Sequence, residues 1–119
     1  SRRNQSTTAP QSLFLLNSRF SLQTAQQFAG SGLSQTSDQE EFIQWIFQRA
    51  LARPATVAEL QRAIQFLKDQ ANRAQQESRL SGQLALPVPV PTRLNPYQAT
   101  AYTDLCLAIF NLNEFIYVD

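Results

Sequence analysis

The amino-acid sequence predicts a small all-α fold, a four-helix bundle that forms one domain over residues 1–119. Three observations lead to this prediction. Apolar residues recur every three to four positions over long stretches, which is the period of an amphipathic helix. Ser, Thr, Asp or Asn precedes these stretches and marks helix starts. Sixteen glutamines supply much of the polar remainder, and glutamine favours helices.

The first expected helix begins near Pro10, with Thr8 as its N-cap, because proline suits the first turn of a helix. Gly30 and Gly32 are predicted to end it, since glycine readily takes the left-handed conformation that closes a helix. The apolar residues between these bounds fall on two adjoining faces: Leu13, Leu16 and Phe20, then Phe14, Ala25 and Phe28.

The second expected helix starts at a capping box, formed either by Ser37 with Glu40 or by Asp38 with Glu41. A stripe of apolar residues follows: Phe42, Ile43, Trp45, Ile46, Phe47, Ala50 and Leu51. A stripe this broad is typical of a helix contacted from more than one side. Its aromatic residues could also line a ligand cavity, although core packing is their more common role.

A short break at residues 53–55 separates the second helix from the third. Thr56 and Glu59 form another capping box at the start of the third helix. The core face then continues through Leu60, Ala63, Ile64, Leu67, Ala71 and Ala74. Because the break is so short, the second and third helices are predicted to form an antiparallel helical hairpin.

A long proline-rich connection precedes the last helix. The helical period is lost from about residue 77 to residue 94, and residues 84–91 carry proline at alternate positions, which favours an extended path. Two interpretations stay open, a strap packed across the bundle and a binding arm for a partner. The apolar edge of such a strap would consist of Leu84, Leu86, Val88 and Val90.

The last expected helix begins at Asn95 as N-cap, with Pro96 in its first turn and Gln98 completing the cap. Its predicted inner face consists of Ala101, Tyr102, Leu105, Ala108, Ile109 and Leu112. The strongly apolar residues 113–119 follow this helix, and we expect them to pack back on the core.

Composition excludes several function classes. The net charge of +1 gives no global field to attract nucleic acid, and every wholly apolar run, residues 13–16 among them, is far shorter than the ~20 residues of a membrane span. We therefore expect neither nucleic-acid binding nor membrane insertion. The chain has no histidine, the usual general base and metal ligand, and we expect no cofactor in this segment. The single cysteine, Cys106, is predicted to be a buried side chain rather than a reactive thiol.

Three segments, residues 7–17, 51–60 and 104–119, together resemble a known family, and the last of them closes on Asn-Glu-Phe-Ile-Tyr-Val-Asp. Their order and spacing resemble the C-terminal part of the planctomycete-specific domain of unknown function, the PSD family. Members lie downstream of cytochrome-c-like domains in large proteins. The resemblance implies that the chain is the C-terminal fragment of a larger, exported or periplasmic protein, and it supplies no catalytic residues.

No catalytic constellation is visible in the sequence, and the candidates for a functional surface are few. Arg53 could pair with a carboxylate, bond helix-end carbonyls or bind a ligand. Glu114 could be a catalytic acid with Asp104 as its partner, whereas bonds to backbone amides or to an arginine are the more ordinary role. Leu107 and Phe110 lie off the inner face predicted for the last helix and would contact the proline-rich segment or neighbouring domains.

Two classes of function follow. The first is a non-catalytic helical module that completes or docks onto a larger multidomain protein, a cytochrome-associated one if the resemblance extends that far. Its partners would be upstream domains of that protein or a second copy of the chain. The alternative is the C-terminal part of a redox or hydrolytic enzyme whose catalytic groups lie mostly upstream.

Overall fold

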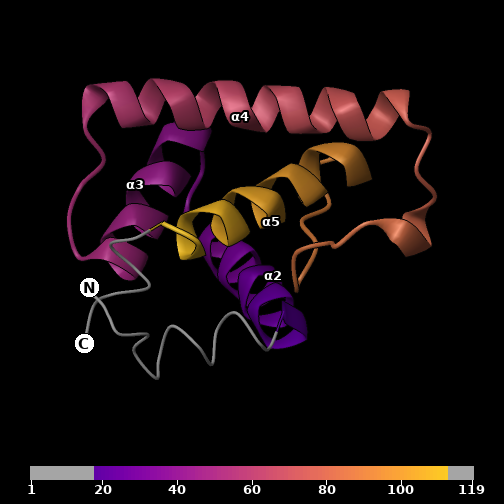
Figure 1. The fold of residues 1–119 in the computed structure, drawn as a ribbon, viewed down its shortest axis with the longest axis horizontal. Helices are drawn as coiled ribbons and strands as arrows, with labels where there is room; N and C mark the ends of the chain where they lie inside the picture. The colour runs from indigo at the N-terminus through magenta and orange to yellow at the C-terminus, as the bar shows by residue number, and fades with distance from the viewer. Residues whose placement is uncertain (1–17, 113–119) are drawn as a thin grey trace, which may run out of the picture.

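The structure, a computed structural model, describes residues 18–112, and in these residues it contains four α-helices, one short 3-10 helix and no strand. The elements are α2 (Ser18–Gln35), α3 (Gln39–Leu51), α4 (Val57–Gln76), η1 (Ser81–Gln83) and α5 (Pro96–Phe110) (Figure 1). The all-α prediction is confirmed. The helix start expected near Pro10 and the packing expected for residues 113–119 lie outside the described residues.

The last helix, α5, is the centre of the fold. It packs against α4 and α2, which form its two most extensive contacts, and it also touches α3. In Figure 1 it crosses between α4 and α2. Its buried residues lie on all sides of its axis: Ala99, Thr100, Ala101, Tyr102, Thr103, Leu105, Cys106, Ile109 and Phe110. Burial on every side is typical of a helix inside a core rather than at its edge.

Aromatic rings join α2, α3 and α5 at the core. The ring of Phe42 meets that of Tyr102 edge to face, with the ring centres 4.8 Å apart. Phe28 meets Phe110 in the same way at 5.1 Å. Because edge-to-face pairs stabilise beyond the area they bury, these contacts fix how α2 and α3 approach α5.

The helix starts predicted for α3, α4 and α5 are confirmed, because each depends on residues that are close in sequence. Of the two alternatives for α3, the structure uses Asp38, whose carboxylate accepts the backbone N–H of Glu41 at 2.7 Å. Complete capping boxes start the other two helices, Thr56 with Glu59 at α4 and Asn95 with Gln98 at α5.

A short connection, residues 52–56, joins α3 to α4, as predicted, but α3 is inclined across α4 in Figure 1, so the two helices do not lie alongside each other as the predicted antiparallel hairpin. Ala52 ends α3 in the left-handed conformation, with φ 58°. Gln44 then clamps the turn, because its side chain accepts from the N–H of Ala55 at 2.8 Å and donates to the Ala55 carbonyl at 3.4 Å. The main packing partner of α4 is nevertheless α5, which lies along it, rather than α3.

The prediction that Gly30 and Gly32 end the first helix is wrong, because α2 continues through both to Gln35. Neither glycine has a positive φ. Both positions are glycine because there is no space for a side chain at either of them. A Cβ on Gly30 would lie 1.9 Å from the carbonyl oxygen of Val88, and a Cβ on Gly32 would lie 2.6 Å from the ring of Phe42. These glycines therefore permit close packing rather than a change of direction.

Residues 84–91 form a strap that crosses α2 and α5. The N–H of Val88 donates to the Gln26 carbonyl at 3.0 Å, and the Gln26 side chain donates to the Leu86 carbonyl at 3.0 Å. From α5, the hydroxyl of Thr100 donates to the Ala85 carbonyl at 3.1 Å. The segment is thus packed on the bundle by backbone hydrogen bonds to both helices.

The side chains that the strap buries differ from those predicted. Leu84 and Pro87 are buried, and Leu86 is half-buried, whereas Val88 and Val90 are 58% and 44% exposed. The expectation of an inward edge is therefore wrong for these two valines. Because the backbone at Val88 approaches α2 directly, the Val88 side chain is left on the outer side.

Gly30→Ala should lower the free energy of unfolding by about 1–3 kcal/mol, because the new methyl group would overlap backbone atoms of the strap, which cannot rotate away. In an open helix the same substitution would be stabilising by about 1 kcal/mol. Chemical denaturation measures the difference, with Gly82→Ala as the control, since a Cβ there would have no neighbour within 4 Å. A stabilised Gly30→Ala chain would contradict the close approach.

Candidate functional site

Arg53 is held in an ion pair at the connection between α3 and α4. Its Nη1 and Nη2 donate to the two carboxylate oxygens of Glu59, each at 2.8 Å. Nη1 also donates to the carbonyl of Pro54 at 3.1 Å, and the guanidinium lies 5.7 Å from the ring centre of Phe47. Such a two-point pair fixes geometry as well as charge. The geometry therefore favours the structural role for Arg53.

Glu59 serves this ion pair and the cap of α4 together. Its Oε1 accepts the N–H of Thr56 at 2.9 Å, while the Thr56 hydroxyl accepts the N–H of Glu59 at 3.1 Å. The hydrogen bonds from Arg53 and then from Thr56 lower the pKa of Glu59 from its ordinary value of 4.5 to about 2. The carboxylate thus stays charged in moderately acidic solution.

Asp104 lies half-buried on α5 and reaches α4. Its Oδ2 accepts a hydrogen bond from Nε2 of Gln70 at 3.0 Å. Burial raises the pKa of Asp104 above its ordinary value, and the bond from Gln70 only partly opposes this. Its predicted partner Glu114 lies outside the described residues, so the pairing of the two acids stays a prediction.

Phe110 and Leu107 do not form the exposed contact surface that was expected of them. Phe110 is 0% exposed, and its ring packs against Phe28, so the prediction of a surface contact is wrong for this residue. Leu107 is half-buried against the core. Ala108 and Leu112, expected inside, are exposed instead. The prediction assumed one inner face, whereas α5 is surrounded by three helices.

Cys106 is fully buried in the core, as predicted, and burial strongly raises the pKa of its thiol.

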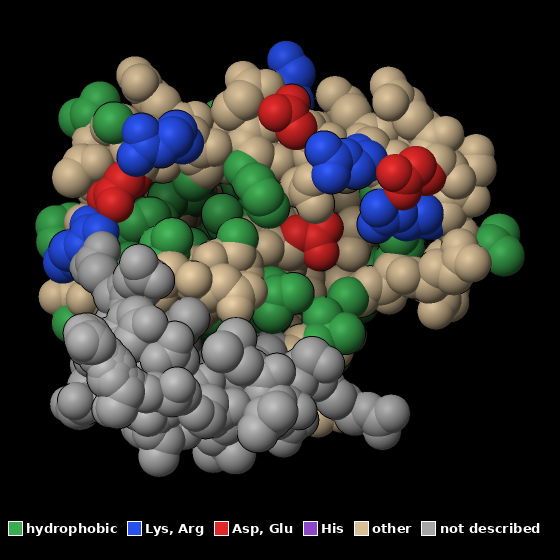
Figure 2. Space-filling model, viewed as in Figure 1, with side chains coloured by type: hydrophobic (Ala, Val, Ile, Leu, Met, Phe, Trp, Pro, Cys, Tyr) green, Lys and Arg blue, Asp and Glu red, His purple; other side chains and the backbone are tan. Residues whose placement is uncertain are grey.

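Among residues 18–112, no group of three or more cysteine, aspartate or glutamate side chains is placed to hold a metal ion. No described helix has the length and apolarity that a membrane crossing requires. On the face shown in Figure 2, basic and acidic side chains are interspersed rather than gathered into a patch of one sign.

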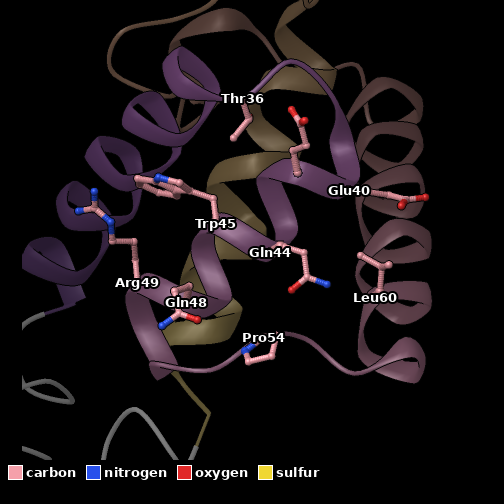
Figure 3. A pocket seen from close by; sticks show the side chains of 9 residues that line it. Thr36, Glu40, Gln44, Trp45, Gln48, Arg49, Pro54 and Leu60 are labelled. Atoms are coloured by element: carbon pink, nitrogen blue, oxygen red, sulfur yellow. The ribbon is translucent and has the colours of Figure 1, made fainter.

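A hollow of about 630 Å³ runs along the outer face of α3, and we call it the α3 groove. It is lined by Thr36, Glu40, Glu41, Gln44, Trp45, Gln48, Arg49, Pro54 and Leu60. In Figure 3, Trp45 and Arg49 lie on the side toward α2, Leu60 of α4 lies on the opposite side, and Pro54 closes one end. The groove therefore combines apolar walls with amide and charged groups along α3.

Trp45 and Arg49 form the most distinctive pair in the α3 groove. The guanidinium carbon of Arg49 lies 4.9 Å from the centre of the Trp45 ring, which is a cation–π contact. Sequence reasoning considered the aromatic residues of this helix as cavity residues, but Phe42 and Phe47 are buried in the core and only Trp45 reaches the groove. The signal that was missed is the spacing of Trp45 and Arg49, one helical turn apart.

The model of a family described as PSD1, protein of unknown function (DUF1553), matches residues 1–67. This range includes every residue of the α3 groove but none of the strap or α5. No curated protein and no solved structure matches the chain.

The Arg53–Glu59 pair should make the fold sensitive to acid. The pKa of Glu59 is lowered in the folded chain, so its stabilising contribution is complete above about pH 4.5 and is lost as the pH falls toward about 2. Glu59→Gln should lower the free energy of unfolding at pH 7 by roughly 1 kcal/mol and should reduce the loss of stability between about pH 4.5 and about pH 2. Chemical denaturation across this pH range measures both effects, with the exposed Glu40→Gln as control. If Glu59→Gln lost as much stability in acid as the unaltered chain, Glu59 would not be the group responsible.

Asp104→Asn should have the opposite effect and raise the free energy of unfolding at pH 7 by roughly 0.5–1 kcal/mol. An amide avoids the burial of a charge and still offers an oxygen to Gln70. Because the pKa of Asp104 is raised in the fold, the gain should disappear below about pH 3.8, where the carboxyl is protonated in both states. Asp69→Asn is the matched control, since Asp69 accepts from Gln65 in an exposed position. A destabilised Asp104→Asn chain would reveal a need for the charge.

Proposed function

Since the chain belongs to the PSD1 family of proteins of unknown function, we propose that it is a non-catalytic helical module that docks onto another part of a larger multidomain protein. The α3 groove is the observation that carries this proposal. It is an apolar-walled hollow with polar groups at its edge, and it lies entirely within residues 1–67, the part that the family model matches.

The residues of the α3 groove suit a protein interface. Trp and Arg are the residue types that most often dominate binding energy at protein–protein contacts. Here Trp45 and Arg49 stand together, with Arg49 exposed and Trp45 half-buried. A partner that covered them would remove both from water while keeping their mutual contact. This arrangement supports docking by a protein surface rather than by a small ion.

The base of the groove is held rigidly before any partner binds. Gln44 is bonded in both directions to Ala55, and Arg53 is paired with Glu59 directly beyond it. Less conformational freedom is lost on binding when the surface is already fixed. The same engagement of Arg53 and Glu59 supports a structural role for this pair over a place in a catalytic centre.

We commit to one partner for the α3 groove, the upstream domains of the same polypeptide. The resemblance to planctomycete-specific domains, whose members follow cytochrome-c-like domains in large proteins, supports this choice. It also supports an exported or periplasmic location. A covalently joined partner needs little intrinsic affinity, because its effective concentration reaches about the millimolar range.

Trp45 provides a direct test, because it is the only tryptophan of the chain. Titration with the remaining domains of the parent polypeptide, produced separately with their tryptophans replaced by phenylalanine, should shift the Trp45 emission to shorter wavelength. Arg49→Glu should weaken that binding about tenfold or more. Gln75→Glu, an exposed change near the other end of α4, should leave it unchanged. Equal binding by both variants would exclude the groove, and self-association abolished by Arg49→Glu would replace the partner by a second copy.

A further inference from the structure

The α3 groove carries opposite charges at its two ends. Glu40 lies in the first turn of α3 and Arg49 in its last turn, and both side chains line the groove and are exposed. Neither forms an ion pair with any residue of the described range. Between these ends, Trp45 and Leu60 lie on opposite sides of the groove (Figure 3). An occupant of the groove therefore meets an acid, an apolar middle and a base in succession.

We propose that the occupant of the α3 groove is a single amphipathic helix of the upstream domains, antiparallel to α3, with an acidic first turn beside Arg49 and a basic last turn beside Glu40. This inference rests on the proposed docking function and adds the kind of element that docks. Charge complementarity selects such a helix, because each of its ends meets a side chain of opposite sign.

A helix suits the α3 groove better than an extended segment does. A helix satisfies its own backbone hydrogen bonds, whereas an extended segment needs partners for its N–H and C=O groups. No strand with a free edge is present within residues 18–112. The side chain of Gln44 in the groove is already bonded to Ala55. The backbone of an extended segment would therefore find few partners along the groove.

The length of the α3 groove fits about two and a half turns of a helix. The nine positions from Glu40 to Arg49 on α3 correspond to roughly 14 Å, at a rise of about 1.5 Å per residue. A partner helix of this length carries apolar side chains at every third or fourth position along one face. That apolar stripe would fill the space between Trp45 and Leu60.

The helix dipole favours the antiparallel orientation. Acidic residues are favourable in the first turn of a helix and basic residues in its last turn, because they complement the partial charges at the two ends. The first turn of the partner helix therefore suits Arg49, and its last turn suits Glu40. In this orientation the positive N-terminal end of the partner also lies near the negative C-terminal end of α3.

The shape of the surface disfavours α3 of a second copy as the occupant. That helix has the same charge pattern, but it forms the floor of its own groove, with Leu60 of α4 on one side. Two copies related in this way would place one hollow against another and leave the space between them unfilled. An upstream helix that protrudes from its domain can enter the groove, and its covalent link gives it an effective concentration of about millimolar.

The charge at Glu40 tests the orientation of the partner helix. Binding to the tryptophan-free upstream domains, followed by the Trp45 emission, should weaken about three- to tenfold in Glu40→Lys, because the basic last turn of the partner would meet a like charge. Asp69→Lys is the matched control, since Asp69 is an exposed acid of α4 outside the groove, and it should leave the affinity unchanged. Equal or tighter binding by Glu40→Lys would contradict the orientation.

Photocross-linking identifies the docked element itself. Gln35→Cys and Ala58→Cys each place one exposed thiol beyond the groove, the first next to Thr36 and the second in the first turn of α4 beyond Pro54, while Cys106 is buried. Labelled with a cysteine-reactive benzophenone, Ala58→Cys should cross-link to the beginning of one upstream segment, and Gln35→Cys to the same segment about nine or more residues later. An extended segment would cover the groove in about four residues.

The outcomes separate this inference from the docking function. A Trp45 emission shift together with cross-links in the reverse order, about four residues apart or in unconnected segments would overturn the antiparallel helix and leave the docking function intact. Absence of any emission shift with the unaltered chain would overturn both. Cross-links between two copies of the chain would assign the groove to self-association and overturn the inference.

Discussion

The structure depends on the close approach of a proline-rich strap to the middle of α2. At Gly30 the backbone of the strap comes so near the helix that even one methyl group would overlap it. The N–H of Val88 and the side chain of Gln26 close the contact with hydrogen bonds, and Thr100 of α5 holds the same strap from the other side. The strap thus links two helices that are far apart in sequence, α2 and α5.

Local features of this fold could be predicted from the sequence, because the residues that make them are neighbours. The capping boxes at Thr56 and Asn95 each involve a side chain and the third residue beyond it, and both are present as predicted. The family resemblance was also readable, and the match over residues 1–67 confirms it. The helix period is equally local, so the all-α class followed from it.

Features that depend on contacts across the chain could not be predicted in the same way. The common local role of glycine predicts a helix end at Gly30, whereas the neighbour of Gly30 in space is Val88, far along the sequence. A single inner face predicts that Phe110 lies outside the core, whereas its helix is enclosed by α2, α3 and α4. One wall of the α3 groove is formed by Leu60, which belongs to α4, and the residue spacing within α3 cannot predict that wall.

The direct measure of the central claim is amide hydrogen exchange at Val88, whose N–H donates to Gln26 of α2 at 3.0 Å. If the strap is a fixed part of the fold, this amide is protected to a degree comparable with the amide of Cys106 in the middle of α5. Exchange of the Val88 amide at the rate of an unstructured peptide, while Cys106 stays protected, would contradict the account, because the strap would then separate from α2 without unfolding the bundle.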